Sequence, residues 1–274
     1  MGIRHVRIAP SRGWSALRLH ELWEYRDLFL ILASRDVKLR YRQTALGVLW
    51  VILQPLLASL IFAVIFGRLA NLPSEGKPYL LYVYAGLLPW NLFAGSLQRA
   101  GNSLVHEARL ISKVYFPRMV VPVASSAAVL VDFLVALAVM AGIMGVYRVF
   151  PTWHLLGLPA ILLLVLLISV GASLWLSALN VYYRDFMYAI PFIIQVWLFA
   201  SPVVYSAGMI PEEWRWFYSL NPLAGVIDGF RWALLGAGEF PALSLGISFL
   251  GAVPLFVGGA YVFRRVERRF ADVI

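Results

Sequence analysis

The chain has 274 residues, of which 61% are hydrophobic and 14% charged, and its formal net charge is +9. Soluble domains have about 45–50% apolar and about 25% charged residues, so this composition excludes an ordinary soluble protein and predicts one integral membrane domain. The chain has no cysteine, which excludes disulfide bonds, thiolate metal sites and a thiol nucleophile.

Residues 1–44 are predicted to form a cytoplasmic arm with an amphipathic helix at the membrane interface. Four apolar residues spaced three and four apart share one helical face: Leu22, Tyr25, Phe29 and Leu32. Three basic residues follow with the same spacing: Arg35, Lys38 and Arg42. Such a helix can lie in the plane of the interface as a basic anchor that sets topology. It can also dock a soluble subunit, and the spacing does not decide between these roles.

Six apolar runs are each long enough to cross a bilayer, which takes about 20 helical residues. We expect these helices near residues 45–66, 79–100, 119–147, 155–181, 186–205 and 242–263. Each contains proline, which removes a backbone hydrogen bond and kinks a helix. Kinked spans are typical of proteins that enclose a pathway, but proline is also frequent in membrane helices generally.

Lysine and arginine are distributed unevenly over this topology. Eighteen of the 23 fall in the segments on the side of the two termini, and five fall on the other side. The positive-inside rule therefore places both termini in the cytoplasm. The basic charge then faces anionic lipid or a cytoplasmic partner, and nucleic acid is not needed to explain it.

The cytoplasmic loop at 106–122 is long and apolar for a plain turn. It reads "HEARLISKVYFPRMVVP", which is amphipathic and ends near a Phe-Pro-Arg sequence. We expect a short helix that contacts another surface. An ordinary charged turn is the alternative.

Asp132 is a charged residue in the middle of the third span. A charge at that depth costs about 2.5–3.5 kcal/mol on insertion scales, so its side chain should face protein or water. It can pair with a polar neighbour or contact a transported substrate. The span lacks a second acid or histidine at matching depth, which argues against a proton relay.

Segment 209–236 is too charged for a seventh span, which would also move the basic C-terminal tail outside. Its "NPL" sequence predicts a break between two short helices at Pro211–Leu220 and Leu223–Leu235. Gly236 is a typical helix stop, and Asp228 and Arg231 are spaced to pair. We expect a re-entrant helical hairpin that enters from the external side. A hairpin lying on the surface is the alternative.

Catalytic motifs are absent from the sequence. It has no G-x-x-x-x-G-K-[ST] phosphate loop, no H-E-x-x-H and no G-x-S-x-G. We therefore expect no enzyme activity, no cofactor and no metal site in this chain. Energy for transport against a gradient would come from a partner.

Seven segments resemble the membrane subunits of ABC-2 type polysaccharide exporters, the permeases for O-antigen, teichoic acid or capsule. They are "LGVLWVILQPLL", "GLLPWNLFAGSL", "LISKVYFPRMVVPVA", "LNVYYRDF", "SPVVYSAGMIPEEW", "NPLAGVIDGFRWALLG" and "ERRFADVI". They occur in the family's order over nearly the whole chain.

The resemblance implies one all-α ABC-2 type transmembrane domain over residues 1–274. It would comprise the arm at 1–44, a six-span core at 45–263 and a cytoplasmic tail at 264–274. The chain would form a homodimer in the bacterial inner membrane, above two copies of a separate ATPase subunit that binds ATP and Mg. The substrate would be a lipid-linked polysaccharide.

The resemblance also suggests roles for particular residues. An ATPase-docking surface would comprise Arg35, Lys38, Arg42, Glu107, Arg109, Lys113, Tyr115, Phe116, Arg118, Arg184 and Asp185. An external gate would comprise Trp214, Trp216, Asn221, Pro222, Asp228, Arg231 and Trp232. Deep aromatic side chains can stack on sugars or pack against lipid, so the candidate pathway residues are Asp132, Trp175, Phe192, Trp197 and Phe199.

Three other functions remain compatible with the sequence. The nearest is an ABC-2 permease for a drug or a small lipid. An ion-coupled carrier would require Asp132 to titrate. A membrane-embedded glycan-processing enzyme would require a polar catalytic cluster, and none is recognisable in the sequence.

Overall fold

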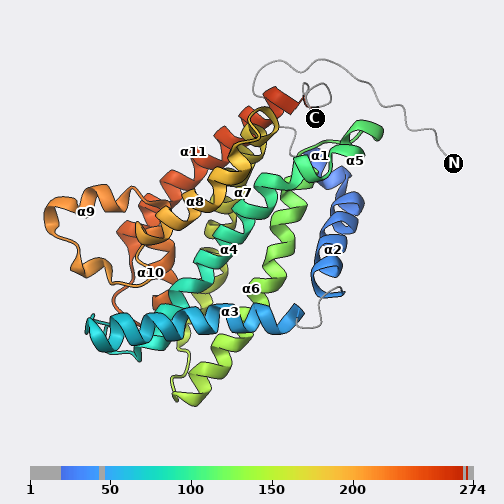
Figure 1. Cartoon of the computed structure of the whole chain (residues 1–274). Coiled ribbons are helices and arrows are strands. Elements are labelled where there is room, and N and C mark those ends of the chain that lie inside the picture. Colours follow the sequence, from blue (N-terminus) through green and yellow to red (C-terminus); the bar gives the residue numbers. More distant parts are fainter. Residues whose placement is uncertain (1–19, 43–46, 268–269, 271–274) are drawn as a thin grey trace.

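The computed structural model describes residues 20–42, 47–267 and 270, and within these residues every regular element is a helix. The amphipathic arm and the short helices precede or separate the long ones (Figure 1). The elements are α1 (His20–Glu24), α2 (Arg26–Arg42), α3 (Gly47–Phe62), the π-helix η2 (Ala63–Leu69), α4 (Tyr79–His106), α5 (Ala108–Lys113), α6 (Val120–Val146), η3 (Trp153–Gly157), α7 (Leu158–Tyr182), α8 (Phe186–Phe199), η4 (Ala207–Met209), α9 (Glu212–Ser219), α10 (Pro222–Leu235) and α11 (Ala242–Glu267).

Five helical segments of the described chain are long and apolar enough to cross a membrane. They are Leu49–Leu69, Tyr79–His106, Val120–Val146, Trp153–Tyr182 and Ala242–Glu267. Each coincides with a predicted span. The predicted span at 186–205 is not confirmed, because α8 has only 14 residues, which at a rise of 1.5 Å per residue corresponds to about 21 Å. The chain turns after Phe199, close to Ser201, whose helical conformation is disfavoured by the following Pro202.

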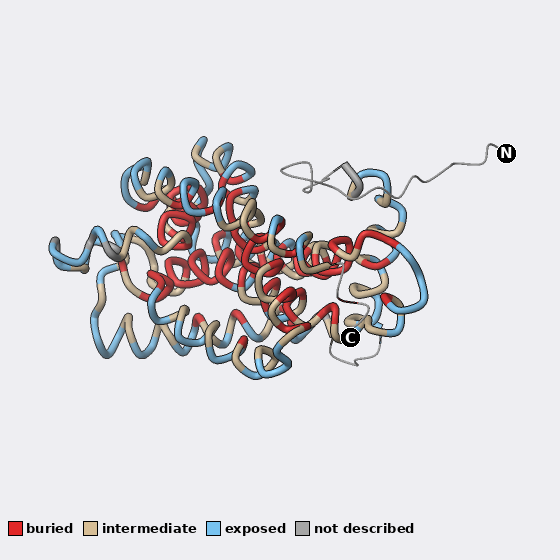
Figure 2. Tube along the Cα trace, turned by 90° about the horizontal axis from the view of Figure 1, so that it is seen from above, coloured by how far each residue is buried: buried red, intermediate tan, exposed pale blue. Residues whose placement is uncertain are grey.

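α4 is the central helix of the fold. In the most apolar stretch of α4, 78% of the residues are buried, compared with 11% in the α3–η2 helix and 17% in α11. α4, α6, α7 and α10 supply most of the larger apolar core, and the buried residues run through the middle of the molecule (Figure 2). α3 lies across α4 and α6 at the edge of this core (Figure 1). Much of its apolar surface is therefore left for lipid or another protein.

Glycines allow three helices of the core to approach closely. A Cβ atom on Gly259 of α11 would lie 2.5 Å from the carbonyl oxygen of Gly171 on α7 and 2.9 Å from the ring of Trp175. A Cβ on Gly225 of α10 would lie 2.2 Å from the carbonyl oxygen of Ser244 on α11. Close backbone approach through small residues is a common way for membrane helices to associate.

We expect Gly259→Ala to lower the thermal unfolding midpoint of the purified chain, because α7 and α11 must separate to admit the methyl group. Overpacking of this kind costs about 1–3 kcal/mol. Gly246→Ala is the matched control on the same helix, since its Cβ would meet no atom within 4 Å. The control should leave the midpoint unchanged or raise it, because alanine is the better helix former. Equal midpoints for the two variants would contradict the close contact.

A second apolar cluster holds the arm against the rest of the chain. The predicted stripe of Leu22, Tyr25, Phe29 and Leu32 is present, and all four side chains belong to this cluster. Other members of the cluster come from the 106–122 segment, α6, α7, α11 and the residues after it, and include Ile111, Phe116, Phe263 and Phe270. The stripe thus packs on protein, whereas the sequence predicted the lipid interface. α2 lies alongside α6 (Figure 1).

The other side of the arm carries apolar side chains that remain exposed. Trp23, Leu30 and Ile31 are 69%, 59% and 63% exposed. The arm therefore has two apolar faces, of which one binds the chain's own core and the other is available to lipid or a partner.

Candidate functional site

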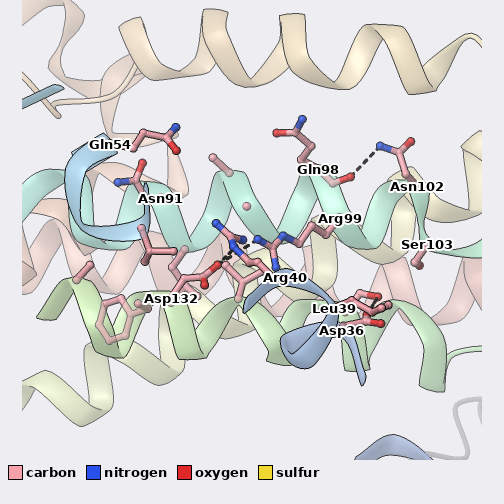
Figure 3. A pocket seen from close by; sticks show the side chains of 18 of the residues that line it. Asp36, Leu39, Arg40, Gln54, Asn91, Gln98, Arg99, Asn102, Ser103 and Asp132 are labelled. Atoms are coloured by element: carbon pink, nitrogen blue, oxygen red, sulfur yellow. Dashed lines mark hydrogen bonds and ion pairs between the residues drawn. The ribbon is translucent and has the colours of Figure 1, made fainter. Parts of the chain in front are cut away.

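A cavity of about 760 Å³ opens between α2, α3, α4 and α6 (Figure 3). Apolar residues form part of its wall, but many of its side chains are polar. The polar lining residues are Asp36, Arg40, Gln54, Asn91, Gln98, Arg99, Asn102, Ser103, His106, Glu107, Ser125 and Asp132. We call this cavity the polar groove.

Amide side chains line the polar groove from two helices. Asn91, Gln98 and Asn102 are seven and four residues apart, so they lie on one face of α4. Gln54 reaches the groove from α3 (Figure 3). Amides exposed to hydrocarbon are costly because lipid offers no hydrogen bonds. The groove therefore has to contact water, a substrate or another polar surface.

Asp132 lies in the wall of the groove and is paired with three side chains. Its Oδ2 is 2.6 Å from Nη1 of Arg40 and 3.1 Å from Nη2 of Arg99. Its Oδ1 accepts a hydrogen bond from the phenol of Tyr41. Burial, together with the carboxylate of Asp132, raises the pKa of Tyr41, so the phenol remains a donor. These contacts confirm that Asp132 faces polar protein groups.

One rim of the groove joins the arm to the 106–122 segment. Arg35 forms a bidentate pair with Glu107, with nitrogen–oxygen distances of 2.6 and 3.2 Å, and its Nη2 is 2.9 Å from Asp36. The hydrogen bond to Glu107 is the main cause that raises the pKa of Arg35. Asp36 in turn accepts a hydrogen bond of 3.0 Å from Ser125 of α6. Two of the predicted docking residues, Arg35 and Glu107, therefore bind each other.

The remaining predicted docking residues differ in exposure. Phe116 is buried in the second cluster, and the backbone N–H of Arg118 donates to Glu267 at 2.7 Å. The others are exposed: Lys38, Arg42, Arg109, Lys113, Tyr115, Arg184 and Asp185. The α7–α8 turn that carries the last two follows Tyr182, which packs on the second cluster. All these segments therefore lie at or near one end of the molecule, although α2 extends away from it.

The predicted break in segment 209–236 is confirmed. α9 ends at Ser219 and α10 begins at Pro222, with Asn221 as the N-cap that accepts a hydrogen bond from Leu223 N. α10 ends at Leu235, and its C-cap residue Gly236 adopts φ 59°. The two helices have different surroundings, because Trp214 and Trp216 of α9 are exposed while most of α10 is buried.

Arg231 of α10 is almost completely buried and connects three parts of the chain. Its side chain donates to the carbonyl oxygens of Tyr82 on α4 at 3.3 Å, Val203 at 2.8 Å and Tyr205 at 3.4 Å. The guanidinium also lies 3.7 Å from the ring centroid of Tyr82. The predicted pair with Asp228 is present at 3.4 Å. Arg231 thus fastens α10 to α4 and to the turn that follows α8.

The predicted pathway aromatics do not gather around Asp132, and none of them lines the polar groove. Trp175 packs on Gly259 at the α7–α11 contact. Trp197 and Phe93 pack edge to face at a centroid distance of 5.0 Å, and Nε1 of Trp197 donates to the side chain of Asn221 at 3.1 Å. Phe192 and Phe199 are 68% and 63% exposed on α8. The frequency of aromatic residues in the sequence does not indicate which face of its helix each ring occupies.

The amides and all three partners of Asp132 were not predicted from the sequence. Asn91, Gln98 and Asn102 were recognisable as polar residues at helical spacing in an apolar span. Arg40, Tyr41 and Arg99 carried no such signal, because they contact Asp132 from other elements of the fold.

Comparison with known proteins relates the chain to membrane transport. Residues 27–235 match the ABC-2 type transporter family. The chain is 30% identical to the O-antigen export system permease protein RfbA of Klebsiella pneumoniae, over 90% of this chain and 95% of that protein. It is 30% identical to RfbA of Myxococcus xanthus, over 78% and 82%. It is 25% identical to the polysialic acid transport protein KpsM of Escherichia coli, over 85% and 91%.

Proposed function

The chain belongs to the ABC-2 type transporter family, and from this premise we propose that it is the permease of an ATP-driven exporter of lipid-linked polysaccharide. Membership confirms the resemblance expected from the seven sequence segments, and it identifies a membrane subunit of a transporter. The similarity to O-antigen export permeases over 90% of the chain is the observation that supports polysaccharide as the substrate class. The 25% identity to a polysialic acid transport protein supports polysaccharide as the general class of substrate.

The polar groove supports a hydrophilic substrate. Gln54, Asn91 and Gln98 present amides in helices that are otherwise suited to a bilayer. A permease for an apolar drug would gain little from these groups, because pockets for apolar ligands are predominantly hydrophobic. An ion-coupled carrier is also less suited to this site, since Asp132 is held by two guanidinium groups and a phenol.

We propose six membrane crossings with both termini in the cytoplasm of a bacterial inner membrane. α8 and the turn that follows it would complete the sixth crossing. The arm, the 106–122 segment and the end of α11 share one apolar cluster, which supports a common cytoplasmic side for them. α9 and α10 would then form the external hairpin, with α10 inserted among the spans.

In this proposal two ATPase subunits dock beneath a homodimer of the chain. They would contact the exposed basic and aromatic side chains of the arm, the α5 segment and the α7–α8 turn. α2 runs from that surface to Asp132, where Arg40 and Tyr41 contact the carboxylate. Movement of the ATPases would therefore reach the groove through the arm, while α10 and Arg231 control the external exit.

Depletion of the chain in its native host tests the proposal. Lipid-linked glycan should accumulate on the cytoplasmic face of the inner membrane, because synthesis continues while export stops. Re-expression of the chain should clear it, provided that the partner ATPase is active. Normal glycan at the cell surface with no accumulation inside would exclude polysaccharide export.

A further inference from the structure

Three amides in the polar groove are open to a ligand. Within the described residues, the side chains of Gln54, Asn91 and Gln98 form no hydrogen bond, and all three are exposed. Asn102 differs, because it donates to the Gln98 carbonyl oxygen at 2.8 Å and accepts from Asn180 at 2.9 Å. Each free amide offers both donors and an acceptor. Together they line a concave surface with capacity for several hydrogen bonds.

The charged groups around the groove neutralise one another. Asp132 pairs with Arg40 and Arg99, and Arg35 pairs with Asp36 and Glu107. Three guanidinium groups therefore stand beside three carboxylates. Figure 3 shows Arg40 and Arg99 turned toward Asp132, so the positive groups point at the wall carboxylate. The groove has hydrogen-bonding capacity without an excess of positive charge.

We propose that the polar groove binds an uncharged, hydroxyl-rich segment of the glycan, and that Asp132 sets this preference because it completes the balance of three carboxylates against three guanidinium groups around the groove. The inference rests on the proposed function and narrows its substrate class. Sugar hydroxyls both donate and accept, which matches the free amides of Gln54, Asn91 and Gln98. A cavity of about 760 Å³ lies in the range of pockets that hold small molecules, about 300–1,000 Å³.

The same arrangement disfavours binding of an acidic glycan. Its carboxylates would be desolvated in the groove and would find the guanidinium groups already paired, with Asp132 repelling them. Specificity of this kind comes from an unfavourable contact with the wrong ligand as much as from a favourable contact with the right one. A second copy of the chain is the competing occupant, because amides also join membrane helices.

The test measures oligosaccharide binding to the full-length chain in lipid nanodiscs, by saturation-transfer NMR and titration. The neutral probe is maltohexaose and the acidic probe is a sialic acid hexamer. We expect the neutral probe to bind at least tenfold more tightly. Gln98→Leu and Asn91→Leu should each weaken its binding by roughly threefold to tenfold, the effect of one lost hydrogen bond. Gln195→Leu is the matched control, since Gln195 is an exposed amide on α8 outside the groove.

Asp132→Asn should reverse the preference. It leaves Arg40 and Arg99 without this carboxylate, so the acidic probe should bind at least tenfold more tightly than to the unmodified chain, through charge-assisted hydrogen bonds. Asp132→Glu should keep the preference for the neutral probe. Gln98→Lys adds a cation without altering the Asp132 cluster, so it should also improve binding of the acidic probe. This variant replaces Asp132→Asn in the test if Asp132→Asn does not fold.

Three results would overturn the inference. The unmodified chain could bind both probes equally, the groove variants could behave like Gln195→Leu, or Gln98→Leu could abolish self-association while leaving sugar binding unchanged. Any of these results combined with glycan accumulation on depletion would remove the inference and leave the proposed function intact. Selective binding without accumulation would instead retain a sugar site and exclude export.

Discussion

Arg231→Met is expected to lower the free energy of unfolding by about 3–5 kcal/mol, the range measured when one partner of a buried ion pair is removed. The side chain of Arg231 is 2% exposed, and methionine would fill much of its volume without replacing any donor. Three carbonyl oxygens and the Asp228 carboxylate would lose their partner. The thermal unfolding midpoint of the purified chain, followed by tryptophan fluorescence, measures the effect.

Two further variants distinguish the lost ion pair from lost volume. Arg231→Met combined with Asp228→Asn should recover part of the stability, because the carboxylate is no longer left buried and unpaired. Arg68→Met is the control at an exposed arginine on the external side of the predicted topology, where the effect should stay within about 0.5 kcal/mol. If Arg231→Met unfolds at the same temperature as the control, Arg231 does not hold α10 in place.

The parts of the fold that the sequence predicted are those set by local chemistry. The Asn221–Pro222 break and the stop at Gly236 depend on backbone preferences of single residues, and both were located within one or two positions. The prediction that the apolar stripe of the arm forms one helical face was also correct. The other members of its cluster were not predictable, because residues such as Phe116 and Phe263 are far away in the sequence and equally suited to lipid.

The candidate site was less predictable because it depends on contacts between distant elements. Asp132 was recognised as a buried charge, yet its partners lie 33 and about 90 residues away. The predicted docking residues Arg35 and Glu107 looked like surface charges, although they pair with each other. Helical periodicity identifies faces, but it does not show which other helix a face will meet.

Crosslinking α2 to α6 should reduce glycan export to background, provided that the arm transmits ATPase movement as proposed. Asp36→Cys and Ser125→Cys would place two thiols where the native side chains are joined by a hydrogen bond of 3.0 Å. The chain has no cysteine of its own, so the pair can be oxidised or bridged by a short bifunctional thiol reagent without side reactions. Export is measured as glycan reaching the cell surface, before and after reduction.

The single Asp36→Cys variant is the matched control, since it also loses the contact between Asp36 and Arg35 but cannot be bridged. Treated with the same reagent, it should export as it does untreated. Binding of the ATPase partner to the bridged double variant should persist, because the exposed docking side chains are unchanged. Reduction should restore export. Undiminished export by a fully bridged population would mean that α2 and α6 move as one body, and that coupling to the groove takes another route.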